Sequence, residues 1–167
     1  LKDILKVIIL YSAAALLIGV FLFIRSGEGV IWLTIAGGIL TLTYARFSMI
    51  GMSEVIIGLL FGPLMFEGIY YVMKKTFSFD VLILSIAVVM FTLAFLYVHT
   101  LLDFDSDQTS HKRTLCCRIG DKNKALFVLA VFYTIGYLAA GYFGVLTGSY
   151  AVLISFLTIP MAVNVFK

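Results

Sequence analysis

Charged residues are scarce in this sequence. Asp, Glu, Lys and Arg make up 13% of its 167 residues, whereas soluble domains carry about 25%. Apolar residues make up 62%, and a core of this size cannot hide so much apolar surface from water. This balance excludes a soluble globular domain and indicates an integral membrane protein whose apolar side chains face lipid.

Basic clusters and cysteine motifs are also lacking. No stretch rich in Lys and Arg alternates with aromatic residues, which excludes a nucleic-acid-binding surface. The two cysteines, Cys116 and Cys117, are adjacent. They have neither the CxxC spacing of a metal site nor a spacing at which cysteines commonly bridge each other. We expect two free thiols in a reducing compartment.

Long apolar runs are abundant. Each run offers close to the ~20 residues that a helix needs to cross the ~30 Å hydrocarbon layer. The runs are continuously apolar, whereas the strands of membrane barrels alternate, so we expect helices. We predict an all-α integral membrane protein, a single membrane domain over residues 1–167 with about six transmembrane helices. The predicted helices are 4–24, 29–45, 52–73, 80–101, 124–146 and 149–166.

The basic residues predict how the helices are oriented. With six crossings, nine Lys and Arg residues fall on the side that holds both chain ends, and three fall on the other side. Loops rich in Lys and Arg stay in the cytoplasm. We therefore expect both chain ends and the loop 102–123 to be cytoplasmic, in a cell (inner or plasma) membrane. The nine are Lys2, Lys6, Arg46, Lys112, Arg113, Arg118, Lys122, Lys124 and Lys167, and the three are Arg25, Lys74 and Lys75.

The loop 102–123 begins with acidic residues. If the fourth helix continues past Leu101, His99, Asp103 and Asp107 lie one turn apart on one face, with Asp105 off that face. Two neighbouring carboxylates repel each other and suit a hard cation. Mg²⁺ typically takes one or two carboxylates together with phosphate oxygens of a substrate.

Basic residues follow the acids directly. Lys112, Arg113 and Arg118 carry the side chains that best match phosphate oxygens. Acids followed by bases suit a metal-bridged diphosphate. The pattern alone leaves a second interpretation open, in which the loop is solvated and its charges neutralise each other.

The order of these residues resembles a known motif. The stretch Asp103-x-x-x-Asp107, followed by Lys112-Arg113-Thr114-Leu115, is similar to the second aspartate motif of the UbiA-type membrane prenyltransferases. Upstream, Tyr44, Gly51-Met-Ser-Glu54 and Phe61-Gly-Pro-Leu64 resemble the same family. The Lys-Arg-Thr-Leu ending looks most like the menaquinone-pathway branch, which prenylates 1,4-dihydroxy-2-naphthoate.

The resemblance implies a fold and a reaction. The fold is a nine-helix bundle with two Asp-rich motifs. This chain looks like a fragment that runs from the third to the eighth helix of that fold. Mg²⁺ between the motifs binds a polyprenyl diphosphate, and an aromatic acceptor takes the prenyl group beside membrane lipid. By this resemblance, Asp103 and Asp107 are Mg²⁺ ligands, Lys112 and Arg113 hold the diphosphate, and Tyr44 and Arg46 lie near the reacting centre.

The sequence also departs from the family pattern. The first Asp-rich motif is missing, since Asp3 is the one acid before Glu28. We therefore expect residues 1–167 alone to be inactive. The alternatives are another acceptor, such as 4-hydroxybenzoate or a glycerol-phosphate lipid, or a non-catalytic membrane subunit or transporter. Glu67, inside an apolar run, is expected near the outer interface rather than in a cavity.

Overall fold

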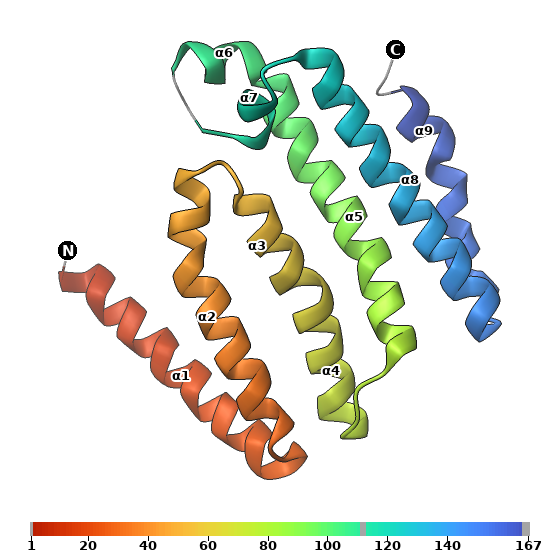
Figure 1. The fold of residues 1–167 in the computed structure, drawn as a ribbon. Helices are drawn as coiled ribbons and strands as arrows, with labels where there is room; N and C mark the ends of the chain where they lie inside the picture. Colours follow the sequence, from red (N-terminus) through yellow and green to blue (C-terminus); the bar gives the residue numbers. More distant parts are fainter. Residues whose placement is uncertain (1, 111–112, 165–167) are drawn as a thin grey trace.

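The computed structural model describes residues 2–110 and 113–164, and within these residues it is all helical. The predicted all-α membrane class is confirmed. Figure 1 shows the helices running up and down beside one another, with α1 at one edge and α9 at the other. The elements are α1 (Lys2–Ser26), α2 (Gly29–Met49), α3 (Ser53–Leu59), η1 (Leu60–Leu64), α4 (Met65–Lys74), α5 (Phe79–Leu102), α6 (Phe104–Thr109), α7 (Leu115–Ile119), α8 (Lys122–Thr147), η2 (Tyr150–Thr158) and α9 (Ile159–Asn164).

Five helices of the described chain are long and apolar enough to cross a membrane: α1, α2, the continuous α3–η1–α4 segment, α5 and α8. The last predicted span is the shorter apolar segment Tyr150–Asn164. Its first nine residues form a 3₁₀ helix and its last six an α-helix. Because a 3₁₀ helix rises ~2.0 Å per residue, the segment reaches roughly 27 Å, close to the ~30 Å hydrocarbon layer.

Two prolines mark changes of helix type. Pro63 lies in the π-helical turn η1, between α3 and α4. Its missing N–H and its ring disturb the bond to the preceding turn, and the wider π turn absorbs this disturbance. Pro160 is the second residue of α9, directly after the 3₁₀ helix η2, and it cannot donate a hydrogen bond to that preceding turn. Both prolines thus coincide with a change in helix type.

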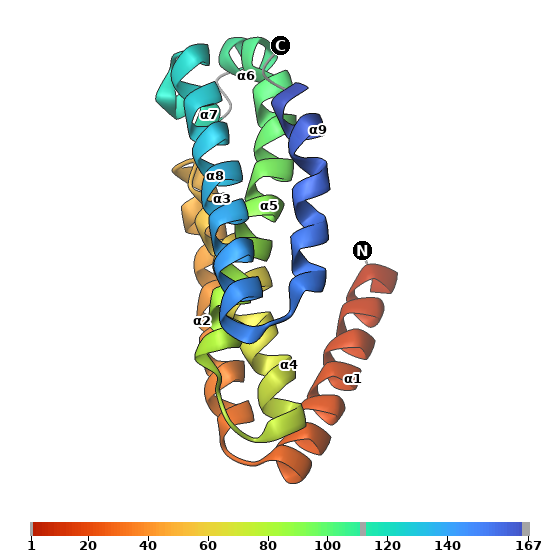
Figure 2. The ribbon, with the colours of Figure 1, turned by 90° about the vertical axis from the view of Figure 1, so that its right-hand side faces the viewer.

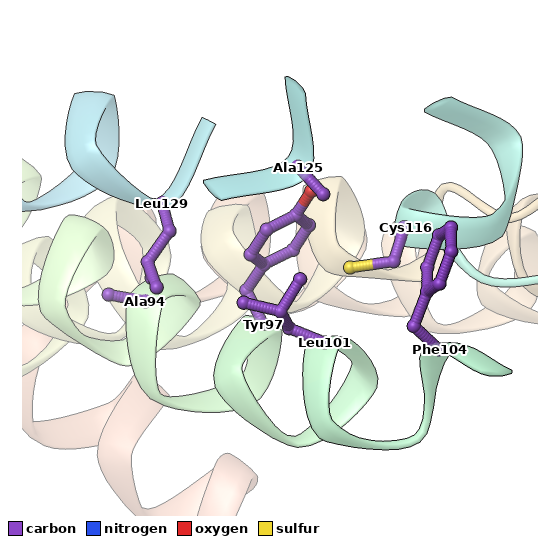
Figure 3. Packing of buried hydrophobic residues seen from close by; sticks show 7 residues of the cluster. All are labelled: Ala94, Tyr97, Leu101, Phe104, Cys116, Ala125 and Leu129. Carbon is purple, nitrogen blue, oxygen red and sulfur yellow. The ribbon is translucent and has the colours of Figure 1, made fainter. Parts of the chain in front are cut away.

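The best-packed part of the bundle joins α5, α8 and the short helix α7. The cluster in Figure 3 consists of Ala94, Tyr97, Leu101, Phe104, Cys116, Ala125 and Leu129. Small residues such as Ala94 and Ala125 let α5 and α8 approach closely. By contrast, no residue in the apolar window of α1 is buried, and Figure 2 shows the N-terminal part of α1 standing away from the other helices. Packing is therefore tightest next to the 103–121 segment.

The two ends of the bundle differ in chemistry. We call the end with the 50–52 turn and the 103–121 segment the connection end. At the opposite end, the Glu67 carboxylate is buried and accepts a hydrogen bond of 3.1 Å from the Ser78 amide, at the start of α5. Glu67 thus satisfies an amide of the α4–α5 turn, and it also lines a pocket there together with Phe77 and Leu82.

Candidate functional site

The acidic residues lie where α5 gives way to α6. Helix α5 ends at Leu102, and Asp103 (φ −87°, ψ 7°) separates it from α6. The Asp107 amide still donates to the Asp103 carbonyl at 2.7 Å. The single unbroken helix that would place His99, Asp103 and Asp107 on one straight face is therefore interrupted at Asp103.

The two predicted metal ligands differ in burial. Asp107 is 5% exposed, whereas Asp103 is exposed. The cause is packing, because Leu101, Phe104 and Asp107 recur every three residues and all three are buried. Phe104 belongs to the core cluster. Packing of Phe104 therefore turns Asp107 inward, while Asp103 stays at the surface.

Asp105 lies apart from this pair, as its spacing predicts. It is exposed, and its carboxylate lies 3.9 Å from the Lys122 ammonium in a solvated ion pair. Exposed pairs of this kind contribute little to stability. The next acid, Asp121, caps α8 by accepting a hydrogen bond of 2.8 Å from the Lys124 amide. Asp105 thus takes part in an ion pair and Asp121 in a helix cap, and neither is assigned as a metal ligand.

The basic residues reach across to the α2–α3 turn. Arg113 Nη1 donates to the Met49 carbonyl at 3.1 Å, and Arg118 Nη1 donates to the Ile50 carbonyl at 3.3 Å. These carbonyls end α2, where the helix dipole favours cations. Lys112, the other predicted diphosphate-binding residue, lies outside the described residues. Arg113 therefore carries the described part of the basic site.

The backbones on both sides of this contact are also close. Gly51 has φ +70°, and a Cβ at this position would lie 3.2 Å from the Thr114 carbonyl oxygen and 3.3 Å from that of Arg113. Only glycine adopts this φ without strain and leaves room for the neighbouring chain. The 113–114 segment is therefore fitted directly onto the α2–α3 turn.

Tyr44 and Arg46 lie on the last turns of α2, and both are exposed. In the described part of the chain, no hydrogen bond or ion pair joins them to Asp103 or Arg113. The structure brings them to the same end of the bundle as the acidic and basic residues.

A polar cleft of about 570 Å³ opens beside Arg113. Sequence reasoning gave no role to its most buried charged residue, Glu54, which is 7% exposed. The sequence feature that could have identified Glu54 is an acidic residue at the start of a long apolar run. The cleft is lined by Ser48, Met49, Ser53, Glu54, Thr100, Arg113 and Thr114.

The two cysteines are free, as the sequence predicts. Cys116 is fully buried, and its sulfur lies 3.3 Å from the Thr100 hydroxyl. Burial raises the pKa of the Cys116 thiol, and the hydrogen bond with Thr100 offsets part of that rise. Cys117 is partly exposed, and its amide donates to the Thr114 hydroxyl, which caps α7. The cysteines therefore hold α7 in place and show no metal-site geometry.

Few potential metal ligands lie together among the residues that the structure describes. In residues 2–110 and 113–164, no group of three or more His, Cys, Asp or Glu side chains could hold a metal by itself. Asp107 and Asp103 offer two carboxylates one turn apart. Mg²⁺ keeps waters and binds through one or two carboxylates plus substrate phosphates, so a metal held by Asp103 and Asp107 would also need phosphate oxygens of a substrate.

The family assignment follows from a sequence comparison. The model of the UbiA prenyltransferase family matches residues 5–167. The chain belongs to this family. Its all-helical fold, its long apolar helices and its acidic-then-basic segment agree with that membership. No curated protein and no solved structure matches the chain.

Membership fixes the general activity. UbiA prenyltransferases are multi-pass membrane enzymes that generally use Mg²⁺ and transfer prenyl groups from prenyl diphosphates to aromatic acceptors. At the connection end, Arg113 lines a polar cleft, and Asp103 and Asp107 lie at the same end of the bundle, at the junction of α5 and α6.

Proposed function

We propose that this protein takes part in the Mg²⁺-dependent transfer of a polyprenyl group to 1,4-dihydroxy-2-naphthoate, in the synthesis of menaquinone. The observation that carries the proposal is the connection end of the bundle. There the buried Asp107 and exposed Asp103 precede Arg113, which is anchored on α2. The Lys112-Arg113-Thr114-Leu115 ending supports the naphthoate as acceptor.

In this proposal the carboxylates of Asp103 and Asp107 hold the metal. A Mg²⁺ ion held there would neutralise charge on the diphosphate. Arg113 and Lys112 bind diphosphate oxygens, and a guanidinium suits them because its planar fork donates two parallel hydrogen bonds. Tyr44 and Arg46, at the end of α2, line the approach to the reacting centre.

The transfer breaks the allylic carbon–oxygen bond, and its electron pair leaves with the diphosphate. The allylic cation then takes an electron pair from the acceptor ring and forms the new carbon–carbon bond. The ring regains aromaticity when that carbon loses a proton, or CO₂ if it carries the carboxylate, and the electron pair of the broken bond returns to the ring. The chain's part is to stabilise the leaving charge and to keep water from the cation. The apolar helices directly below the connection end suit that second task.

The proposal places the connection end in the cytoplasm, because nine of the twelve Lys and Arg residues fall on that side. It also holds that residues 1–167 alone give no product. Two carboxylates support one side of a metal site, and the described residues hold no larger ligand group.

The test is prenyl transfer by the complete protein in membrane vesicles with three acceptors. These are 1,4-dihydroxy-2-naphthoate, 4-hydroxybenzoate and a glycerol-phosphate lipid. We expect product with the naphthoate alone, and none after EDTA treatment. Product with another acceptor would replace the naphthoate in this account. Absence of product with all three, together with no Mg²⁺-dependent binding of polyprenyl diphosphate, would reject the account.

A further inference from the structure

The polar cleft at the connection end is assembled from distant parts of the chain. Its walls come from the end of α2, the start of α3, the last turns of α5 and residues 113–114. The volume of about 570 Å³ falls within the 300–1,000 Å³ range of small-molecule sites. The cleft therefore has room for a one-ring or two-ring aromatic molecule.

Glu54 is the unusual residue of this cleft. It is 7% exposed, and its Oε2 accepts a hydrogen bond of 3.3 Å from the hydroxyl of its neighbour Ser53. Among the described residues, no Lys or Arg forms an ion pair with it. A carboxylate offers about four lone pairs to donors, and a buried one costs free energy unless donors satisfy it. Glu54 therefore has unused acceptor capacity in a cleft large enough for a ligand.

Arg113 lines the same cleft and is held at one nitrogen by the Met49 carbonyl. A guanidinium carries five N–H donors, and this bond uses one of its nitrogens. The cleft thus presents an acceptor at Glu54 and donors at Arg113. In the proposed function, the N–H donors of Arg113 bind the diphosphate.

The chemistry of Glu54 selects among ligands. A diphosphate oxygen would be repelled by its carboxylate. A metal would find too few ligands, because Glu54 belongs to no group of three potential metal-ligating residues in the described chain. A hydroxyl group on an aromatic ring fits, because it donates to the carboxylate while the ring fills the cleft.

We infer that Glu54 binds the ring hydroxyl of the aromatic acceptor and orients the ring beside the diphosphate. The inference rests on the proposed function and adds the acceptor's position to it. Arg113 links the two subsites, because it lines the acceptor cleft and follows the acidic pair in sequence.

A structural role for Glu54 makes a different prediction. An acid in the first turn of a helix interacts favourably with the helix dipole. If that were the whole role, Glu54→Gln would lower the melting temperature and leave substrate binding unchanged. Ligand binding instead predicts a change confined to the acceptor.

The experiment uses the complete protein in lipid nanodiscs, kept free of oxygen to protect the acceptor. KM is measured separately for 1,4-dihydroxy-2-naphthoate and for polyprenyl diphosphate, and the Kd of the naphthoate alone is measured by calorimetry. We expect Glu54→Gln to raise the KM and Kd of the acceptor about ten- to hundredfold. The KM of the diphosphate stays within about twofold. Glu28→Gln, which removes an exposed acid at the opposite end, is the matched control.

Methyl ethers of the acceptor extend the test without a protein variant. Methylating the hydroxyl that meets Glu54 should weaken binding to the native protein and add no further loss in Glu54→Leu, which has no side-chain acceptor, because both changes remove the same hydrogen bond. The inference is overturned if each ether binds the native protein as tightly as the parent, or if Glu54→Gln raises both KM values equally. These ether measurements decide the matter even if Glu54→Gln does not fold.

The acceptor and diphosphate measurements also distinguish a failure of the Glu54 inference from a failure of the proposed function. If the native protein binds polyprenyl diphosphate with Mg²⁺ but Glu54→Gln leaves acceptor binding unchanged, the inference fails and the proposed function stands. If the native protein neither binds the diphosphate nor forms product, the proposed function fails.

Discussion

The guanidinium of Arg113 donates a hydrogen bond of 3.1 Å to the main-chain carbonyl oxygen of Met49, across a sequence separation of 64 residues. Arg118 makes the equivalent bond to the adjacent Ile50 carbonyl, at 3.3 Å. The two arginines therefore attach the segment after the acidic residues to the end of α2. In the proposed function, only Arg113 also binds the diphosphate.

The arginine pair allows these two roles to be separated. Arg113→Gln and Arg118→Gln each remove one charge-assisted hydrogen bond at the surface, so each should cost about 1 kcal/mol of stability. Arg113→Gln should also weaken diphosphate binding by tenfold or more, whereas Arg118→Gln should change it less than about threefold. Thermal unfolding and binding of geranylgeranyl diphosphate measure the two effects. Equal loss of diphosphate affinity in both variants would reduce Arg113 to a structural anchor.

Gly51 tests the contact between the two backbones. Gly51→Ala should cost about 1–3 kcal/mol for the positive φ, and more because its Cβ meets the Arg113 and Thr114 carbonyls. Gly148 has φ +66° with nothing near its Cβ position, so Gly148→Ala reports the backbone cost alone. We expect the larger drop in melting temperature, and a weaker diphosphate affinity, for Gly51→Ala. Similar drops in the two variants would mean that the close approach has no energetic weight.

The thiols provide a test of packing at α7. Burial raises the pKa of the Cys116 thiol, so at any given pH a smaller fraction is the reactive thiolate. In the Cys116→Ser variant, maleimide should modify Cys117, which is partly exposed. In the Cys117→Ser variant, maleimide should modify Cys116 slowly until the pH is raised or the protein unfolds. Rates are measured between pH 7 and 9 by mass spectrometry. Fast modification of Cys116 at pH 7 would show that α7 is not packed as described.

Glu67 is predicted to be structural. Its carboxylate accepts from the Ser78 amide, and Glu67→Gln keeps an acceptor oxygen for that amide. We expect Glu67→Gln to retain prenyl transfer and stability. Glu67→Leu should lose about 1 kcal/mol, the usual cost of removing such a cap. A loss of transfer in Glu67→Gln with an unchanged melting temperature would instead place this carboxylate in the reaction.

Apolar run length was enough to predict the helical membrane class and most helix positions. It could not predict that residues 150–158 form a 3₁₀ helix, because length and hydropathy do not distinguish 3₁₀ from α geometry. The spacing of Asp103 and Asp107 suggested a shared face. The break at Asp103 depends on Phe104 packing into the core cluster, which is a tertiary effect.

The cleft could not be predicted for a similar reason. Glu54 and Arg113 are far apart in sequence, and they line one cleft because residues 113–114 pack on Gly51. A positive φ at Gly51 is needed for that approach. Residue types alone identified Arg113 as a phosphate-binding candidate. They gave Glu54 no role beyond its place in the family resemblance, because its burial in the cleft is a tertiary feature.

The central claim is that the acidic pair at the connection end binds metal and diphosphate together. Its most direct test is Mg²⁺-dependent binding of geranylgeranyl diphosphate to the complete protein and to Asp103→Asn, Asp107→Asn and Asp80→Asn. Asp80 is an exposed acid at the other end of α5. We expect a loss of at least tenfold in both site variants, since even partners of metal ligands matter by 10–100-fold, and no change in Asp80→Asn. Equal Mg²⁺-dependent affinity in all four proteins would contradict the account.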